Sequence, residues 1–198
     1  MTAVSSTPTV LRAASSADFL AALPRLTGMS APESCFVVMF DGKRTQGAAR
    51  IDLPERLEEQ LGTPGPELEA WIRQVAELAI RSLGPVVVVI DTASLLTEQP
   101  AASPHGVLTA ILNDVLQAGD VPVRDALVVG SDGWASFMDD SRDQPELHSL
   151  DEIGASPLHD PEHRPLPVHE WRAEHPGQTA EGAEVIEAFA AQMRGRQR

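Results

Sequence analysis

The order of four apolar segments between residues 66 and 129 constrains this fold more than any other feature of the chain. Residues 66–83 carry apolar side chains at helical spacing up to a Gly84-Pro85 stop, and residues 86–90 are continuously apolar and β-branched. A second helical pattern spans residues 103–119, and residues 126–129 form another apolar run. Strand, helix and strand in this order make a right-handed crossover between parallel strands. The sequence therefore predicts an α/β fold with residues 86–90 as a strand buried on both faces.

Two further patterns predict hairpins on either side of this parallel pair. Residues 35–40 and 47–53 flank Asp41-Gly42, and a Gly130–Gly133 turn leads from residues 126–129 into residues 134–138. A short helix is expected from Ser15 or Ser16, with Pro24 kinking it or ending its regular bonding near Leu23. We predict one domain over residues 15–140: a mixed sheet of about five strands, made of two hairpins and a central parallel pair, with helices against it. Residues 1–14 are predicted to be a flexible lead-in.

The character of the chain changes at Asp139. From there the sequence holds 13 acidic and 6 basic residues, six prolines and five of the six histidines. Residues 141–198 are therefore predicted to be an extended acidic arm. Residues 181–193 recover helical spacing and predict a terminal amphipathic helix, whose apolar positions are Val185, Ile186, Phe189 and Met193. Because a short isolated helix is marginal in water, we expect these four side chains to bind a protein partner or to pack back on the domain.

Composition narrows the class of protein. The chain of 198 residues is 42% hydrophobic but only 4% aromatic, so its core must be aliphatic. A formal net charge of -14 repels phosphate backbones and anionic membrane surfaces, which argues against nucleic-acid and membrane partners. The single cysteine, Cys35, rules out an internal disulfide. With no run of eighteen apolar residues and no secretory leader pattern, we expect a cytoplasmic protein.

Several separated motifs carry a family resemblance. The chain resembles a DUF4192-like, actinobacterial domain-of-unknown-function family from about residue 11 to residue 158, as a shortened member. The motifs are residues 18–24 (DFLAALP), 26–28 (LTG), 50–54 (RIDLP), 124–129 (RDALVV) and 134–136 (WAS). That family has no assigned activity, so the resemblance implies a fold and an intracellular origin and transfers no catalytic residue. Its members often place cysteines shortly after the tryptophan strand, and residues 137–147 hold none here.

Three residues are candidates for catalysis. Asp91 follows the buried strand at the sheet edge where α/β proteins usually bind ligands; alternatively, it caps a loop. Asp132 is expected near Asp91 if the two strands are neighbours, as a paired-carboxylate cation site, or else it serves a tight turn. Ser34 stands at a strand entrance as a candidate nucleophile, but no elbow motif surrounds it or Cys35, and a buried packing role is the alternative.

Metal and cofactor motifs are sparse. His159 and His163, with Asp160 and Glu162 nearby, have side chains that suit a transition metal, but the surrounding prolines interrupt any regular helix face and favour a solvated arm. The chain contains no GxxxxGK[ST] loop, and the sequence predicts no cofactor.

Two hypotheses of function follow. The first is a non-catalytic binding or regulatory module that acts through protein–protein contacts or self-association. The second is a small-molecule-binding enzyme, metal-assisted or not, that uses carboxylates at the carboxyl ends of the parallel strands.

Overall fold

The computed structural model describes residues 12–63, 65–82, 84–97, 99–138, 144–180 and 183–186. Residues 1–11 of the predicted lead-in lie outside these ranges, and residues 12–14 are described. Within these ranges, every helix is too short or too polar to span a lipid bilayer.

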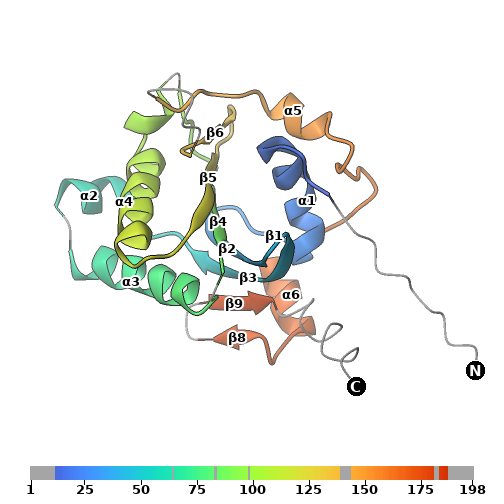
Figure 1. Cartoon of the computed structure of the whole chain (residues 1–198), viewed down its shortest axis with the longest axis horizontal. Coiled ribbons are helices and arrows are strands. Elements are labelled where there is room, and N and C mark those ends of the chain that lie inside the picture. The colour runs from blue at the N-terminus through green and yellow to red at the C-terminus, as the bar shows by residue number, and fades with distance from the viewer. Residues whose placement is uncertain are drawn as a thin grey trace, which may run out of the picture.

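A mixed sheet of seven described strands, in the order β6-β5-β4-β2-β3-β9-β8, forms the middle of the molecule (Figure 1). Its strands in chain order are β2 (Ser34–Asp41), β3 (Arg44–Asp52), β4 (Val86–Asp91), β5 (Val123–Val129), β6 (Trp134–Ser136), β8 (Thr179–Ala180) and β9 (Ala183–Ile186). Strands β4 and β5 are parallel, and all other neighbours in this sheet are antiparallel. The predicted mixed sheet of two hairpins and a parallel pair is therefore confirmed, and β9 and β8 extend it beyond β3.

Helices cover both faces of the sheet (Figure 1). On one face lie α2 (Leu57–Gly62), α3 (Pro66–Ile80) and α4 (Pro104–Ala118), and α4 is preceded by the short 3-10 turn η1 (Pro100–Ala102). On the other lie α1 (Ser16–Thr27), α5 (Leu150–Gly154) and α6 (Val168–Glu174), together with a small parallel pair of β1 (Met29–Ser30) and β7 (Leu166–Pro167). The result is three layers with an apolar core on each side of the sheet.

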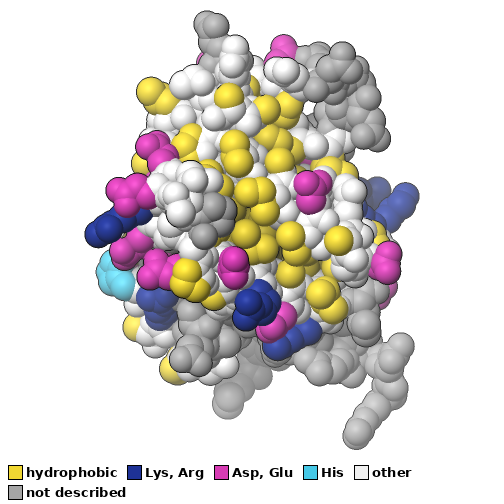
Figure 2. Space-filling view, turned by 90° about the vertical axis from the view of Figure 1, so that its left-hand side faces the viewer, with side chains coloured by type: hydrophobic (Ala, Val, Ile, Leu, Met, Phe, Trp, Pro, Cys, Tyr) yellow, Lys and Arg dark blue, Asp and Glu magenta, His cyan; other side chains and the backbone are white. Residues whose placement is uncertain are grey.

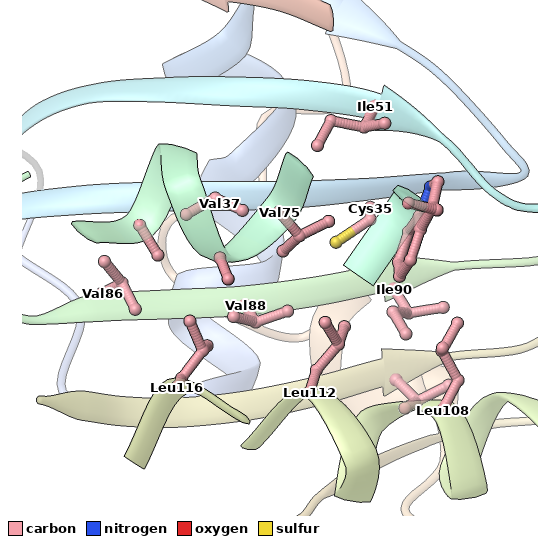
Figure 3. Close-up of a cluster of buried hydrophobic side chains, with 14 of the residues drawn as sticks. Cys35, Val37, Ile51, Val75, Val86, Val88, Ile90, Leu108, Leu112 and Leu116 are labelled. Atoms are coloured by element: carbon pink, nitrogen blue, oxygen red, sulfur yellow. The ribbon is translucent and has the colours of Figure 1, made fainter. Parts of the chain in front are cut away.

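The core between the sheet and α3 and α4 is built mainly from aliphatic side chains (Figure 3) and also includes Trp71. Strand β4 contributes alternate residues to it, and α4 contributes one residue per turn. The labelled side chains are Cys35, Val37, Ile51, Val75, Val86, Val88, Ile90, Leu108, Leu112 and Leu116. Because residues 86–90 are buried and β4 has neighbours on both sides, the predicted interior strand is confirmed.

Helix α1 runs further than the sequence predicted. Pro24 lies inside it, and the helix ends at Thr27 rather than near Leu23. The end is set by Gly28, which adopts a left-handed φ of 72° and donates its backbone N–H to the Pro24 carbonyl at 2.8 Å. Proline removes one N–H donor, and this local loss does not end a helix whose buried face includes Leu20 and Leu23.

The carboxyl-terminal region differs from the prediction in its last described residues. The amphipathic helix expected over residues 181–193 is wrong for Ala183–Ile186, which form β9 and pair with β3, with Val185 opposite Ala49 and Ile186 opposite Ala48. The open edge of β3 offers unpaired backbone groups, and a short β-branched segment satisfies them as a strand. The other two predicted partner-binding residues, Phe189 and Met193, lie outside the described residues.

Much of the region before β9 packs on the domain. Trp171 of α6 is only 3% exposed and joins the core beneath α1. Ser156 donates a hydrogen bond to the Asp18 carboxylate of α1 at 2.6 Å. These contacts tie residues 150–175 to the same face of the sheet as α1.

Candidate functional site

One row of residues crosses the sheet at the carboxyl ends of the parallel strands β4 and β5. Strand pairing aligns Asp52, Ser34, Asp91, Val129 and Trp134 in that row. We call this end of the sheet the carboxyl edge. Cross-strand partners project to the same face, so the structure brings Ser34 and Asp91 together.

Ser34 is closed off from any substrate. It is 0% exposed, its hydroxyl accepts a hydrogen bond from Arg50 Nε at 2.8 Å, and it donates to the Pro32 carbonyl at 3.3 Å. The Arg50 guanidinium, itself buried, also pairs with the Asp52 carboxylate. A catalytic serine must be reachable and must face a base. Ser34 instead orients the Arg50 side chain between β2 and β3.

Asp91 is the one predicted candidate with an unusual electrostatic setting. Burial, and next the negative charge of Glu33, raise the pKa of its carboxyl group to about 6. Among the residues that the structure describes, none donates a hydrogen bond to this carboxylate. A carboxyl group that titrates this close to neutrality can exchange a proton at physiological pH.

Glu33 is the acidic neighbour that the sequence analysis missed. It precedes β2 in a left-handed conformation with φ of 54°. Its carboxylate accepts hydrogen bonds from Thr92 Oγ1 at 3.0 Å and from the Ala93 backbone N–H at 2.7 Å. These bonds hold one carboxylate against the segment that leaves β4, beside Asp91.

His105 is the second missed residue. It lies in the first turn of α4, which Ser103 caps by accepting a hydrogen bond from the Gly106 N–H at 3.0 Å. Within the described structure, Nδ1 of this buried imidazole has no hydrogen-bond partner. Burial lowers the pKa of His105, against the opposing charges of Glu33 and Glu58, and so favours the neutral ring.

Asp132 does not join this group. Its two carboxylate oxygens accept the backbone N–H groups of Leu96 at 2.8 Å and Thr97 at 3.0 Å. These bonds lower its pKa and fix the loop after β4 to the turn between β5 and β6. The charge that acts on Asp91 is that of Glu33, while the Asp132 carboxylate binds backbone groups of the loop after β4.

The two predicted histidine ligands also serve local structure. His163 places Nε2 3.2 Å from the Pro24 carbonyl of α1, and His159 is exposed with its backbone N–H bonded to the Ser156 carbonyl at 3.0 Å. Across the described ranges, no group of three or more histidine, cysteine or acidic residues can hold a metal ion.

A second feature, on the opposite side of α4 from the core, is apolar and exposed. We call it the α4 face; it comprises Val107, Ala110, Ile111, Val115 and Ala118 of α4 with Ile80 of α3. Val107 and Val115 are each 37% exposed and Ile80 is 52% exposed. Ile80 lies against the end of α4, since a Cβ at Gly119 would be 3.7 Å from its Cδ1. Figure 2 shows this side of the molecule, where hydrophobic side chains gather in a band down the middle.

The α4 face is unusual for a surface helix. Helix α4 buries Leu108, Leu112 and Leu116 on its inner side, yet its outer side is also mostly apolar, with Asp114 as its one charged residue. The outer side of a surface helix is normally charged or polar. The sequence showed the inner apolar stripe of α4. It did not show that the outer stripe would stay uncovered in the described part of the fold.

Comparison with known proteins places the chain by its sequence. A family model described as "Domain of unknown function (DUF4192)" matches residues 17–166. The chain belongs to this family. The resemblance found in the sequence motifs is thereby confirmed. Both the carboxyl edge and the α4 face of this DUF4192 chain fall within the matched residues, whereas α6, β8 and β9 follow them. No curated protein and no solved structure matches the chain.

Proposed function

We propose that this DUF4192 chain is a non-catalytic binding module that acts through protein–protein contacts at the α4 face. The observation that carries the proposal is the outer side of α4, where Val107, Ala110, Val115 and Ala118 are exposed around a single charged residue, Asp114. Contiguous exposed apolar patches on a folded chain mark binding surfaces more often than scattered single residues do. We therefore assign the protein contact to helix α4 of the domain and no longer to the terminal helix expected from the sequence.

The state of two of the three candidate catalytic residues, Ser34 and Asp132, supports a role without chemistry. Ser34 is fully buried and bonded to Arg50, and Asp132 is engaged by two backbone donors. We further propose that the module works in the cytoplasm. The single cysteine supports this location, because Cys35 is buried as a thiol and the fold uses no internal disulfide.

The test uses a photo-crosslinking amino acid placed at Val107 or Val115 in the full chain, in the cells that express it. Ala155, exposed at the end of α5 on the other side of the sheet, is the matched control position. Cross-linked proteins are identified and purified, and their affinity for the chain is measured. We expect cross-links from positions 107 and 115 but not 155, and at least a tenfold loss of affinity, about 1.4 kcal/mol, for Val115→Glu. Equal cross-linking at position 155, or unchanged affinity of Val115→Glu, would contradict the proposal.

One observation favours a second candidate function, a small-molecule-binding enzyme at the carboxyl edge. Asp91 has no hydrogen-bond donor among the described residues, and the charge of Glu33 acts on it. A carboxyl group whose pKa is raised to about 6 beside a second carboxylate suits proton transfer to a bound molecule. The test is a thermal-shift screen of small amines and divalent cations at pH 7.5. A ligand of this edge raises the melting temperature of the wild-type chain but not of Asp91→Asn, and a shift of equal size in both proteins would contradict it.

A further inference from the structure

The sequence of β3 gives little protection to the outer edge of this strand. On the inner side β2 pairs with β3 along its whole length, whereas on the outer side β9 pairs with residues 48–51. An edge strand presents unpaired backbone N–H and C=O groups, and proteins commonly place charged residues or proline there to prevent association. Residues 45–49 read TQGAA and contain neither. Without β9, the sheet would end in a strand of nine residues, about 30 Å long, with an uncharged middle.

The hairpin of β8 and β9 has the features that end a sheet without inviting another chain. It lies outside β3 in the order of strands, so that β8 is the last strand on this side (Figure 1). Strand β8 is only two residues long, and a very short edge strand offers few backbone groups to a second chain. The sequence of residues 179–186 also contains two acidic residues, Glu181 and Glu184, in contrast to the uncharged run in β3.

The hairpin is attached to the sheet separately from the helix that precedes it. Helix α6 is anchored by the buried Trp171, and Arg172 Nη2 lies 3.8 Å from Asp52 Oδ2. Strand β9 is joined to the domain by its four residue pairs with β3. The family match includes β3 but ends at residue 166, before α6 and the hairpin. Loss of the four pairs would therefore uncover β3 while α6 and both cores stay in place.

We infer that the hairpin of β8 and β9 is a built-in cover that keeps β3 from pairing with β3 of a second copy of this chain. When the cover is displaced, two β3 edges can pair antiparallel across a two-fold axis through backbone hydrogen bonds. The net charge of -14 opposes the approach of two copies, so the uncovered chain associates only at high concentration. This role goes beyond the proposed function and does not involve the α4 face.

The test displaces β9 in the full chain with the double substitution Glu184→Pro and Val185→Pro. Neighbouring residues of a strand direct their N–H groups to opposite sides, so one of the two prolines removes a donor to β3. Sedimentation from about 5 to about 500 µM should show the mass of this variant rising from 21.2 kDa towards twice that value. Wild type should stay at the mass of one chain. The matched control, Glu184→Thr with Val185→Thr, keeps both N–H groups and should behave as wild type.

Amide hydrogen exchange shows whether the edge itself is uncovered and then paired. At about 5 µM, the amides of residues 48–51 that point towards β9 should exchange at least tenfold faster in the proline variant than in wild type. Their protection should return at about 500 µM, where two β3 edges pair. The amides of residues 87–89 in β4 should exchange as in wild type, which shows that the sheet remains folded.

Three results would overturn the inference. The first is unchanged exchange at residues 48–51 in the folded proline variant. The second is a proline variant whose mass equals that of wild type over the whole concentration range, and the third is equal association of the threonine control. If the proline variant does not fold, Glu184→Gly with Val185→Gly replaces it, because two glycines lower strand propensity and keep both N–H groups. That variant should associate more strongly than the threonine control, and equal masses of the two would overturn the inference.

Discussion

Replacing Asp91 with asparagine should stabilise the fold at neutral pH, because the folded chain holds this carboxyl group where its charge is unfavourable. Burial and the charge of Glu33 raise the pKa of Asp91 from its ordinary value of 3.8 to about 6. The folded chain therefore binds this proton more tightly than the unfolded chain does. The contribution of Asp91 to the stability of the fold is therefore most favourable below pH 3.8, and it falls as the pH rises from 3.8 to about 6.

The size of the effect follows from the shift. Two pKa units at 1.36 kcal/mol each amount to about 3 kcal/mol of unfavourable free energy at pH 7 and about 0.5 kcal/mol at pH 4. The asparagine side chain of the variant keeps the shape of the aspartate and carries no charge at either pH. The Asp91→Asn variant should therefore gain about 2 kcal/mol more over wild type at pH 7 than at pH 4.

Urea denaturation of both proteins at a series of pH values between 4 and 8 measures this difference. The comparison at each pH cancels the contributions of every other titrating group. Asp132→Asn is the matched control, because hydrogen bonds from Leu96 and Thr97 lower the pKa of Asp132 and give that variant the opposite pH dependence. If the gain from Asp91→Asn were the same at pH 4 and pH 7, the electrostatic account of the carboxyl edge would be wrong.

Three further outcomes are expected. Trp171→Ala should lower the free energy of unfolding by about 3 to 5 kcal/mol, because Trp171 is only 3% exposed beneath α1. Limited proteolysis should then cut residues 144–180 faster than in wild type, and an unchanged cleavage pattern would contradict this. Asp132→Ala should lower the free energy of unfolding, measured by urea denaturation, by about 1 kcal/mol at pH 7, because the Asp132 carboxylate holds the loop after β4. This loss of stability should shrink as the pH falls below 4, and an equal loss at both pH values would contradict the prediction. Cys35 should not react with a thiol reagent until the chain is unfolded, because burial raises its pKa to about 12; rapid labelling of the native chain would contradict it.

The sequence predicted the centre of the fold well because its signals there are local and agree with one another. Residues 86–90 are β-branched without interruption, and the helices on either side end at a glycine-proline pair and begin at a serine cap. Each of these features fixes backbone geometry within a few residues. The crossover rule then assigns the parallel pair without any knowledge of distant contacts.

The predictions failed where tertiary contacts outweigh local preference. Residues 183–186 have helical spacing, but the open edge of β3 provides backbone partners that the sequence does not show, and the segment becomes β9. Pro24 remains inside α1 because the buried side of the helix and the Gly28 end outweigh one missing hydrogen bond.

The candidate site shows the same division. Ser34 and Asp91 were singled out separately, but only the register of β2 on β4 makes them neighbours. Glu33 was missed because its left-handed backbone conformation has no signature in the sequence. The α4 face was missed because helical periodicity identifies the buried stripe and says nothing about what covers the other side.

Methyl NMR of the full chain, titrated with a purified partner identified by cross-linking, tests the central claim most directly, namely that the α4 face is a contact surface. When the partner is added, we predict chemical-shift changes in the methyl groups of Ile80, Val107, Ile111 and Val115. The methyl groups of Val168, half-buried on α6 across the sheet, should stay constant. Constant shifts at all four α4-face residues, or changes centred on α6 instead, would contradict the account.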